Sequence, residues 1–239
     1  MPTEPDPRDF PELPPGLAPA WIDTPRPRRG PKPAHTVPGI VAAAVTIADT
    51  DGLAAASLPN IAAALGLTTN ALYRYIGSKE ELLVLLADAG FGPPPAALEG
   101  SSWRPAVRAW SRAALGRYRG RPWLLDIPFR GDPVTPNRLG WTELLLSVLP
   151  DLSGPDALRC ASLISDVTRA TAERQRSFAD PDSVDSPDRA ADIRAFLRPL
   201  LVERGYALVA SLTAATGFPA ADEDYGLERV LDGIATRLP

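Results

Sequence analysis

The chain has 239 residues, of which 45% are hydrophobic and 23% are charged, and its formal net charge is −4. This composition is typical of a globular protein with enough material for one large domain or two modest ones. The negative net charge excludes a protein that coats nucleic acid by bulk charge, whereas a local basic patch is compatible with it. Alanine-rich and aliphatic stretches recur without β-type alternation, which predicts an all-helical fold.

A single histidine, His35, and a single cysteine, Cys160, limit the chemistry that the chain can support. A Cys/His zinc site needs about four ligands, and a Ser-His-Asp or Cys-His centre would have to use His35, which lies among prolines. We therefore expect no catalytic residues, no metal and no cofactor. One cysteine allows no intramolecular disulfide, and we see neither a signal peptide nor an apolar run that approaches the roughly 20 residues of a membrane span, so we expect a cytoplasmic protein without membrane contact.

Residues 1–34 are rich in proline and lack apolar periodicity, so we expect a flexible extension. Its last part carries four basic side chains, and from Thr24 onward no acidic residue precedes Asp49. The basic residues are Arg26, Arg28, Arg29 and Lys32. Prolines keep such a segment extended, which suits an arm that lies along a DNA groove. The alternative interpretation is a solvated, charged linker.

Residues 35–90 predict four short helices that begin at a capping residue or a proline and are separated by turns. In chain order we expect them at 38–51, 58–65, 70–76 and 79–89. Ser78 and Glu81 have the spacing of a capping box at the start of the fourth. Beyond the break at 90–95, longer helices are expected near 101–119, 121–128, 135–149, 155–178, 188–215 and 222–237.

Residues 61–76 have the pattern of a helix-turn-helix motif. Gly66 allows a sharp turn between two short helices, and the leucines on either side of it are expected to be buried. On the second helix, Leu72 and Ile76 are four residues apart and face inward. Small polar residues remain near the start of this helix, which lets it enter a major groove about 12 Å wide.

This run resembles the tetracycline-repressor (TetR) family of transcription regulators over residues 40–86. The residues that match the family pattern are Gly66, Leu72, Tyr73, Tyr75, Ile76, Lys79 and Leu82. The resemblance implies a three-helix helix-turn-helix domain at the N-terminus, a connecting helix, and a C-terminal helical bundle that binds a ligand and forms the dimer.

The resemblance also implies roles for individual residues at the DNA. The implied base-reading residues are Thr69, Asn70 and Ala71; the implied phosphate contacts are Tyr73, Tyr75 and Lys79; and Ser57 and Asn60 match positions that touch the backbone or an occasional base. Residues 36–90 hold two basic against five acidic side chains, a net charge of −3, although phosphate binding needs cations. We therefore hypothesise that the four basic arm residues reach phosphates or a flanking minor groove.

The resemblance continues more weakly into the C-terminal part, where it suggests a ligand chamber. The candidate ligand-binding residues are aromatic or polar: Trp103, Trp110, Trp141, Asn137, Asp166, Arg169 and Glu173. Tryptophans at this density suit the lining of an apolar chamber, and the three charged residues lie on one side of a predicted helix. The alternatives are a tryptophan-rich core and a solvated face of salt bridges.

A homodimer is expected from two predicted helices. The last one carries an apolar stripe of Leu227, Val230, Leu231, Ile234 and Leu238, and the helix at 155–178 has a face of small residues. Two such helices from each subunit would form a four-helix interface, and the family resemblance implies the same arrangement.

We therefore expect a flexible basic extension at 1–34, a helix-turn-helix domain at 35–90 and a ligand-binding and dimerisation domain at 91–239. The predicted function is a dimeric repressor that binds a palindromic double-stranded DNA operator and is released by a small-molecule effector. One alternative is a ligand-independent regulator or activator whose C-terminal domain only dimerises. A second is an enzyme or small-molecule carrier that has acquired a DNA-binding headpiece.

Overall fold

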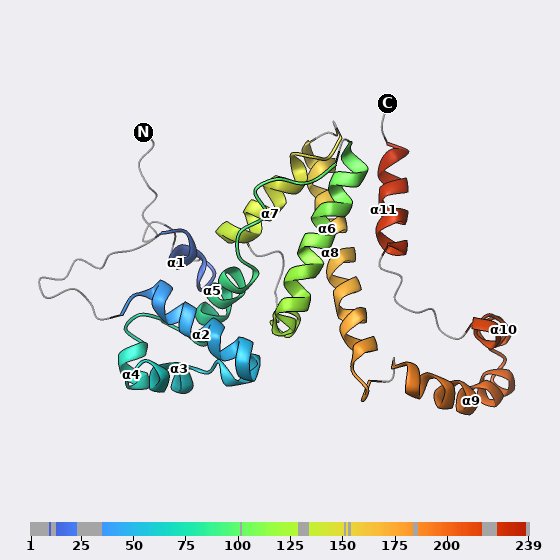
Figure 1. Cartoon of the computed structure of the whole chain (residues 1–239), viewed down its shortest axis with the longest axis horizontal. Helices are drawn as coiled ribbons and strands as arrows, with labels where there is room; N and C mark the ends of the chain where they lie inside the picture. Colours follow the sequence, from blue (N-terminus) through green and yellow to red (C-terminus); the bar gives the residue numbers. More distant parts are fainter. Residues whose placement is uncertain are drawn as a thin grey trace, which may run out of the picture. The chain divides into compact units, whose positions relative to one another are not determined.

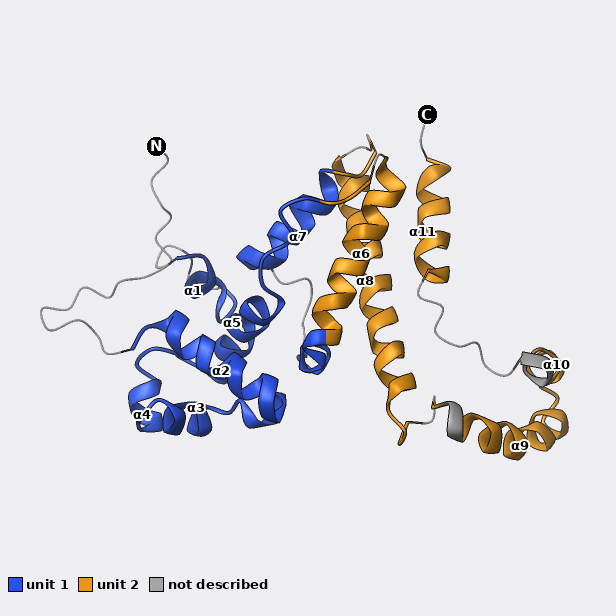
Figure 2. Cartoon of the chain, viewed as in Figure 1, with its two compact units in different colours: residues 1–97, 120–147 blue, residues 98–119, 148–239 orange. Residues whose placement is uncertain are grey.

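The computed structural model describes residues 10, 13–22, 35–100, 102–128, 134–150, 152, 154–183, 186–216 and 224–237. Every regular element within these ranges is a helix, so the expected all-α fold is confirmed (Figure 1). Contacts divide the chain into two compact units, which are residues 1–97 with 120–147 and residues 98–119 with 148–239 (Figure 2). Among the described helices, none combines the length and the apolar content needed to cross a membrane.

Unit 1 contains the predicted helix-turn-helix region. Its helical elements are α1 (Leu17–Trp21), α2 (Val37–Asp51), the 3-10 turn η2 (Leu53–Ala55), α3 (Leu58–Ala64), α4 (Thr69–Leu72), α5 (Lys79–Phe91), the 3-10 turn η3 (Pro122–Leu125) and α7 (Pro136–Leu146). Helix α2 packs on α3 and α5, and α3 packs on α4. Their shared core consists of aliphatic side chains that are fully buried: Ile40, Ile61, Leu72, Ile76, Leu82 and Leu86.

Hydroxyl side chains begin the headpiece helices, as the sequence predicts. Four N-cap hydroxyls each accept a hydrogen bond from the amide three residues on, namely those of Thr36, Ser57, Thr68 and Ser78. The capping-box glutamate, Glu81, accepts from the amide of Gly77 at 3.1 Å, one residue before the N-cap. These bonds satisfy amides that have no partner inside their own helices.

A cluster of contacts ties η3 to the headpiece helices within unit 1. The indole N–H of Trp123 donates to Asp49 on α2 at 2.8 Å, and Arg121 donates to the same carboxylate at 3.0 Å and to the carbonyl of Gly90 on α5 at 2.9 Å. Gly90 lies so close to the Trp123 ring that a Cβ atom there would be 2.9 Å from Cζ2 and still closer to Cη2.

Unit 2 consists of α6 (Trp103–Gly120), α8 (Gly154–Ala179), α9 (Pro187–Glu203), α10 (Ala207–Thr216) and α11 (Tyr225–Ala235). Buried apolar residues of α6 and α8 include Val107, Trp110 and Ile164. A buried hydrogen bond of 3.0 Å between the hydroxyls of Ser111 and Thr168 joins these two helices. Helix α11 packs on α8, whereas α9 and α10 pack on each other.

The structure departs from the predicted helices at several points. The expected helix at 188–215 is broken at Gly205, whose φ of +76° favours glycine; the amide of Tyr206 donates to the carbonyl of Leu201, which is a Schellman ending. The expected helix at 121–128 is only the 3-10 turn η3. Helix α1 was not expected, because a five-residue helix between prolines leaves no periodic signal.

Candidate nucleic-acid interface

The turn between α3 and α4 has the geometry that its glycine predicts. Gly66 has a φ of +67°, and the amide of Leu67 donates to the carbonyl of Ala62 at 2.8 Å, which closes α3 with a Schellman ending. The next residue, Thr68, immediately caps α4 by accepting from the amide of Ala71 at 3.2 Å. This short connection fixes the angle between the two helices of the motif.

Helix α4 is anchored from one side only. Leu72 and Ile76 are fully buried, while Asn70, Tyr73 and Arg74 are exposed, with Tyr73 at 49%. The helix is one turn long, and residues 73–75 continue it as a hydrogen-bonded turn rather than as the expected helix to 76. An exposed polar face on a rigidly anchored support is what a helix that enters a major groove needs.

Four of the predicted DNA contacts line one groove of about 700 Å³ within unit 1. They are Ser57, Thr69, Tyr73 and Lys79, which come from the starts of α3, α4 and α5 and from the turn after α4. Asp51 and Asp126 also line this groove. The groove therefore combines hydroxyl and ammonium groups, which bind phosphate, with carboxylates, which repel it.

The other predicted contacts differ in how far they are available. Asn60 is exposed, but its side-chain nitrogen donates to the carbonyl of Ala55 at 2.9 Å. Its side-chain oxygen is therefore the atom that can accept a hydrogen bond from a partner. Ala71 and Tyr75 are half-buried. The four arm residues, Arg26, Arg28, Arg29 and Lys32, lie outside the described residues.

The acidic residues of the headpiece are largely engaged within unit 1. Asp49 is held by Arg121 and Trp123, Glu81 accepts from Gly77, and Asp88 is 8% exposed. The other two of the five, Asp51 and Glu80, are exposed. Because Arg121, which pairs with Asp49, lies outside the counted range 36–90, the formal charge of −3 overstates the negative potential that DNA would meet.

Two of the predicted ligand residues lie in unit 1 and make internal contacts. The indole N–H of Trp141 donates to the carbonyl of Gly92 at 2.9 Å, and its ring meets the ring of Phe91 edge-on, with 5.1 Å between the centroids. The side-chain amide of Asn137 donates to Asp88 at 3.0 Å. These contacts hold α7 against the last turn of α5.

The remaining predicted ligand residues lie in unit 2. Trp110 is buried on α6, and Trp103 is half-buried beneath the guanidinium of its neighbour. On α8, Arg169 pairs with Glu173 at 3.0 Å, while Asp166 is exposed. Glu173 also lines an open groove of about 780 Å³ along the C-terminal half of α8. The pair has the geometry of the solvated face that was the alternative interpretation.

Sequence reasoning missed Asp88, the buried carboxylate of α5. It accepts hydrogen bonds from the backbone amides of Asn137 and Arg138 at 3.0 and 3.3 Å, so it caps the start of α7 from another helix. A signal was available, because Asp88 stands between Leu85 and Phe91 at helical spacing in an otherwise apolar stripe. An acidic residue in such a stripe needs a partner when buried.

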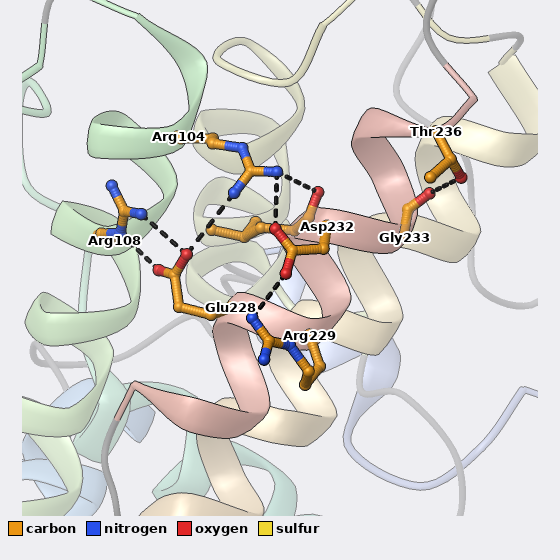
Figure 3. A network of polar contacts seen from close by, with 8 residues as sticks. Arg104, Arg108, Glu228, Arg229, Asp232, Gly233 and Thr236 are labelled. Carbon is orange, nitrogen blue, oxygen red and sulfur yellow. Dashed lines mark hydrogen bonds and ion pairs between the residues drawn. The ribbon is translucent and has the colours of Figure 1, made fainter.

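A second group that the sequence did not reveal fastens α11 to α6 within unit 2. Arg108 donates to Glu228 at 2.6 and 2.8 Å, and Arg104 donates to Asp232 at 3.0 Å (Figure 3). Arg229 donates to the other oxygen of Asp232 at 2.6 Å. The hydrogen bonds from Arg108 lower the pKa of Glu228, and those from Arg104 and Arg229 lower the pKa of Asp232.

The apolar stripe of the last helix is used inside the chain. Leu227, Leu231 and Ile234 are at most 5% exposed, and α11 packs on α8 of the same chain. These three residues are therefore not free to form the expected dimer interface, and a dimer would have to use a different surface. Leu238 lies outside the described residues, and Val230 is half-buried.

Comparison with known proteins agrees with the helix-turn-helix interpretation. The model of the bacterial regulatory proteins of the tetR family matches residues 40–86. The chain is 34% identical over 222 residues to the HTH-type transcriptional repressor DrrR1 of Streptomyces coeruleorubidus, which covers 90% of this chain and 82% of that protein. It is 31% identical over 223 residues to an HTH-type transcriptional regulator of Saccharopolyspora erythraea. This match covers 85% of this chain and 86% of that protein.

The fold is also found among solved structures. ActR from Streptomyces coelicolor, a TetR family protein crystallised in complex with actinorhodin, superimposes with a TM-score of 0.70 at 23% identity, covering 86% of this chain and 99% of ActR. The long match to DrrR1 and the family match at 40–86 confirm the resemblance stated from the motif. The chain belongs to the tetR family of bacterial regulatory proteins and is a helix-turn-helix transcription regulator.

Proposed function

We propose that the protein acts as a homodimer that binds a palindromic operator through two headpieces and leaves it when a small molecule binds. The observation that carries this proposal is the exposed face of α4 and its surroundings. Asn70 and Tyr73 project from a helix anchored by Leu72, and Lys79 stands at the start of α5 beside the same groove. Base-reading by Thr69, Asn70 and Ala71 and phosphate contact by Tyr73, Tyr75 and Lys79 are part of the proposal.

A dimer is supported by the unburied hairpin of α9 and α10. None of their described side chains is buried, and six large apolar ones are 41–79% exposed: Phe196, Val202, Tyr206, Leu208, Val209 and Leu212. Helices gain most of their stability by burying an apolar face, and apolar patches of this extent are uncommon on monomers. We infer that a second copy of the chain covers this hairpin, since reading two half-sites requires two headpieces.

The dimer surface is tested by light scattering on two matched variants. Replacing Leu208 and Leu212 by aspartate should give a monomer, because both side chains are more than 70% exposed here and would be buried by the partner. Leu139→Asp on α7 in unit 1, at 37% exposure, is the control and should remain dimeric. A stable dimer of the double variant would place the interface elsewhere.

Release by a small molecule is supported by the fold rather than by an observed chamber. ActR, which has this fold, was crystallised with actinorhodin and with (S)-DNPA. In this chain Trp103 and Trp110 on α6 are the candidate aromatic contacts, together with the buried hydroxyls of Ser111 and Thr168. Asp166, Arg169, Glu173, Asn137 and Trp141 stay candidates with weaker support, because all of them except Asp166 are engaged in internal contacts.

The decisive experiment measures binding of the purified protein to duplexes tiled across the DNA around its own gene, at two salt concentrations. Tight binding to one palindromic segment that is retained at the higher salt supports the proposal. Equal and fully salt-sensitive binding to every duplex would contradict it, since this is the behaviour of non-specific attachment to phosphates. A compound that binds the protein without changing its operator affinity would refute release.

One alternative has a specific observation in its favour. Four of the seven predicted ligand residues, namely Asn137, Trp141, Arg169 and Glu173, each make an internal contact that gives them a structural role. This is what a ligand-independent regulator with a purely dimerising C-terminal domain would show. Quenching of tryptophan fluorescence by a compound that also releases operator DNA would decide against this alternative.

A further inference from the structure

The start of α7 has two acceptors for the same two amides. Pro136 at the first helical position has no N–H, and the next two amides, of Asn137 and Arg138, donate to Oδ1 of Asp88 at 3.0 and 3.3 Å. In most helices an N-cap side chain accepts from these amides. Here the N-cap is Thr135, and its Oγ1 is buried without a hydrogen-bond partner among the described residues.

The backbone of Thr135 already has the conformation of a capping residue. Its φ of −98° and ψ of 158° lie in the extended region, as at the capping hydroxyls of Ser57 and Thr68. Rotation about its χ1 bond is therefore enough to bring the hydroxyl to the amides if Asp88 withdraws. The residue is 2% exposed, so bulk solvent does not reach the hydroxyl in its present position.

Asp88 binds α7 by more than its capping bonds. The side-chain amide of Asn137 donates to Oδ2 of Asp88 at 3.0 Å and to its backbone carbonyl at 3.1 Å. If Asp88 withdraws, the carboxylate regains water and Thr135 regains a partner, so each arrangement satisfies the amides of α7. The two arrangements differ in whether the last turn of α5 is attached to α7, which makes the contact a two-position element.

We propose that Asp88 and Thr135 exchange as the cap of α7, and that this exchange determines whether α5 is held in its present position. Asp88 is thus a positioning residue for the headpiece, because α5 begins at Lys79, one of the proposed phosphate contacts, and packs on α2. The consequence for operator binding rests on the proposed function, whereas the exchange of caps does not.

The exchange is tested by amide hydrogen exchange at Asn137 and Arg138 in the full chain. Thr135→Val replaces the hydroxyl by a methyl group and should leave both exchange rates within about two-fold of the parent chain. The reason is that the hydroxyl makes no hydrogen bond to α7 while Asp88 caps this helix. Asp88→Ala should raise them modestly, since Thr135 takes over. The double variant should exchange at least about ten-fold faster than Asp88→Ala, because no cap is left.

Two outcomes of this cycle would overturn the proposal. Faster exchange in Thr135→Val alone would mean that the hydroxyl already caps α7. Equal rates in Asp88→Ala and in the double variant would mean that Thr135 never replaces Asp88. If Asp88→Ala does not fold, Asp88→Asn preserves the side-chain size while weakening the acceptor, and Thr135→Val must then show the same ten-fold effect in that background.

The position of α5 is measured by spin labels at Glu80 on α5 and Glu143 on α7, both exposed, in a Cys160→Ser background. Thr135→Val should keep the single distance of the parent chain, and Asp88→Ala should add a second one. Identical distributions in both would show that other contacts fix α5 and would refute its release. Neither measurement uses DNA, so a chain that recognises no operator contradicts the proposed function without deciding the exchange.

Discussion

The guanidinium of Arg108 donates two nearly parallel hydrogen bonds, of 2.6 and 2.8 Å, to the carboxylate of Glu228, which joins α6 to the last described helix, α11. Planar pairing of this kind is the strongest form of ion pair in proteins. It acts beside the apolar contacts of Leu227, Leu231 and Ile234, so α11 is fixed by charge on one side and by burial on the other. Both halves of this attachment can be tested separately.

The ion pair between Arg108 and Glu228 predicts a loss of stability in acid. The pKa of Glu228 is lowered from its ordinary value of 4.5, so its contribution is fully present above that value and is lost as the pH falls through the lowered folded pKa. Glu228→Gln should reduce the free energy of unfolding by about 1–2 kcal/mol at pH 7 and by less near pH 3. Denaturant melts at both pH values measure this.

The matched control for Glu228 is Glu173, which pairs with Arg169 on the surface of α8 and is 46% exposed. Glu173→Gln should change the free energy of unfolding by less than about 0.5 kcal/mol at either pH. Equal effects of the two substitutions would show that the Arg108 pair is no stronger than a surface pair.

The apolar contacts of α11 predict a larger loss of stability than the ion pair does. Leu231 is fully buried, and Leu231→Ala should cost about 2–5 kcal/mol of stability through lost burial and the cavity left behind. Leu163→Ala, at a side chain that is 52% exposed, should stay within about 0.5 kcal/mol. A Leu231 variant with unchanged thermal unfolding would mean that α11 is not docked on α8.

Two glycines should respond to alanine in opposite directions. A Cβ atom at Gly90 would lie within 3.0 Å of two Trp123 ring atoms, so Gly90→Ala should destabilise unit 1 by about 1–3 kcal/mol. Gly116 lies inside α6 with nothing near its added Cβ, so Gly116→Ala should stabilise by about 0.5–1 kcal/mol. Thermal melts of the two variants compare them directly, and a stabilised Gly90→Ala would refute the close packing of α5 on η3.

Loss of Lys79 should weaken DNA binding equally for all sequences. Lys79→Ala removes an ammonium group from the groove that Thr69 and Tyr73 line, and the slope of log affinity against log salt should fall by about 1. Arg112→Ala, an exposed cation of α6, should leave the slope unchanged. Fluorescence anisotropy at several salt concentrations measures both, and an unchanged slope for Lys79→Ala would remove this residue from the interface.

The sequence predicts the headpiece well because its signals are local. Ser57 and Ser78 lie directly before the helices that they cap, and Gly66 adopts the positive φ that the turn requires. Gly205 gives the same local signal between α9 and α10, but it stands inside a long stretch of helix-favouring residues that masks it. The helix expected at 188–215 therefore ran through this break.

The contacts that the sequence did not predict are long-range. Asp88 and Asn137 are 49 residues apart, and Arg108 and Glu228 are 120 apart, so no spacing rule connects them. The apolar stripe of α11 shows the related difficulty that periodicity reveals which face is buried but not against what. Leu231 satisfies the pattern equally well in a dimer and within a single chain, and the structure uses it within one chain.

Helix α1 changes where an independently folding headpiece begins. Gly16 lies against Val84 and the carbonyl of Glu81 on α5, and the indole of Trp21 donates to the carbonyl of Val134 at 2.7 Å. The segment 13–22 therefore supports α5, and a truncation at residue 34 would remove this support together with the four basic residues at 26–32. A minimal fragment has to start before residue 13 and include 120–147, whereas neutralising the cations in the intact chain separates the loss of charge from the loss of support.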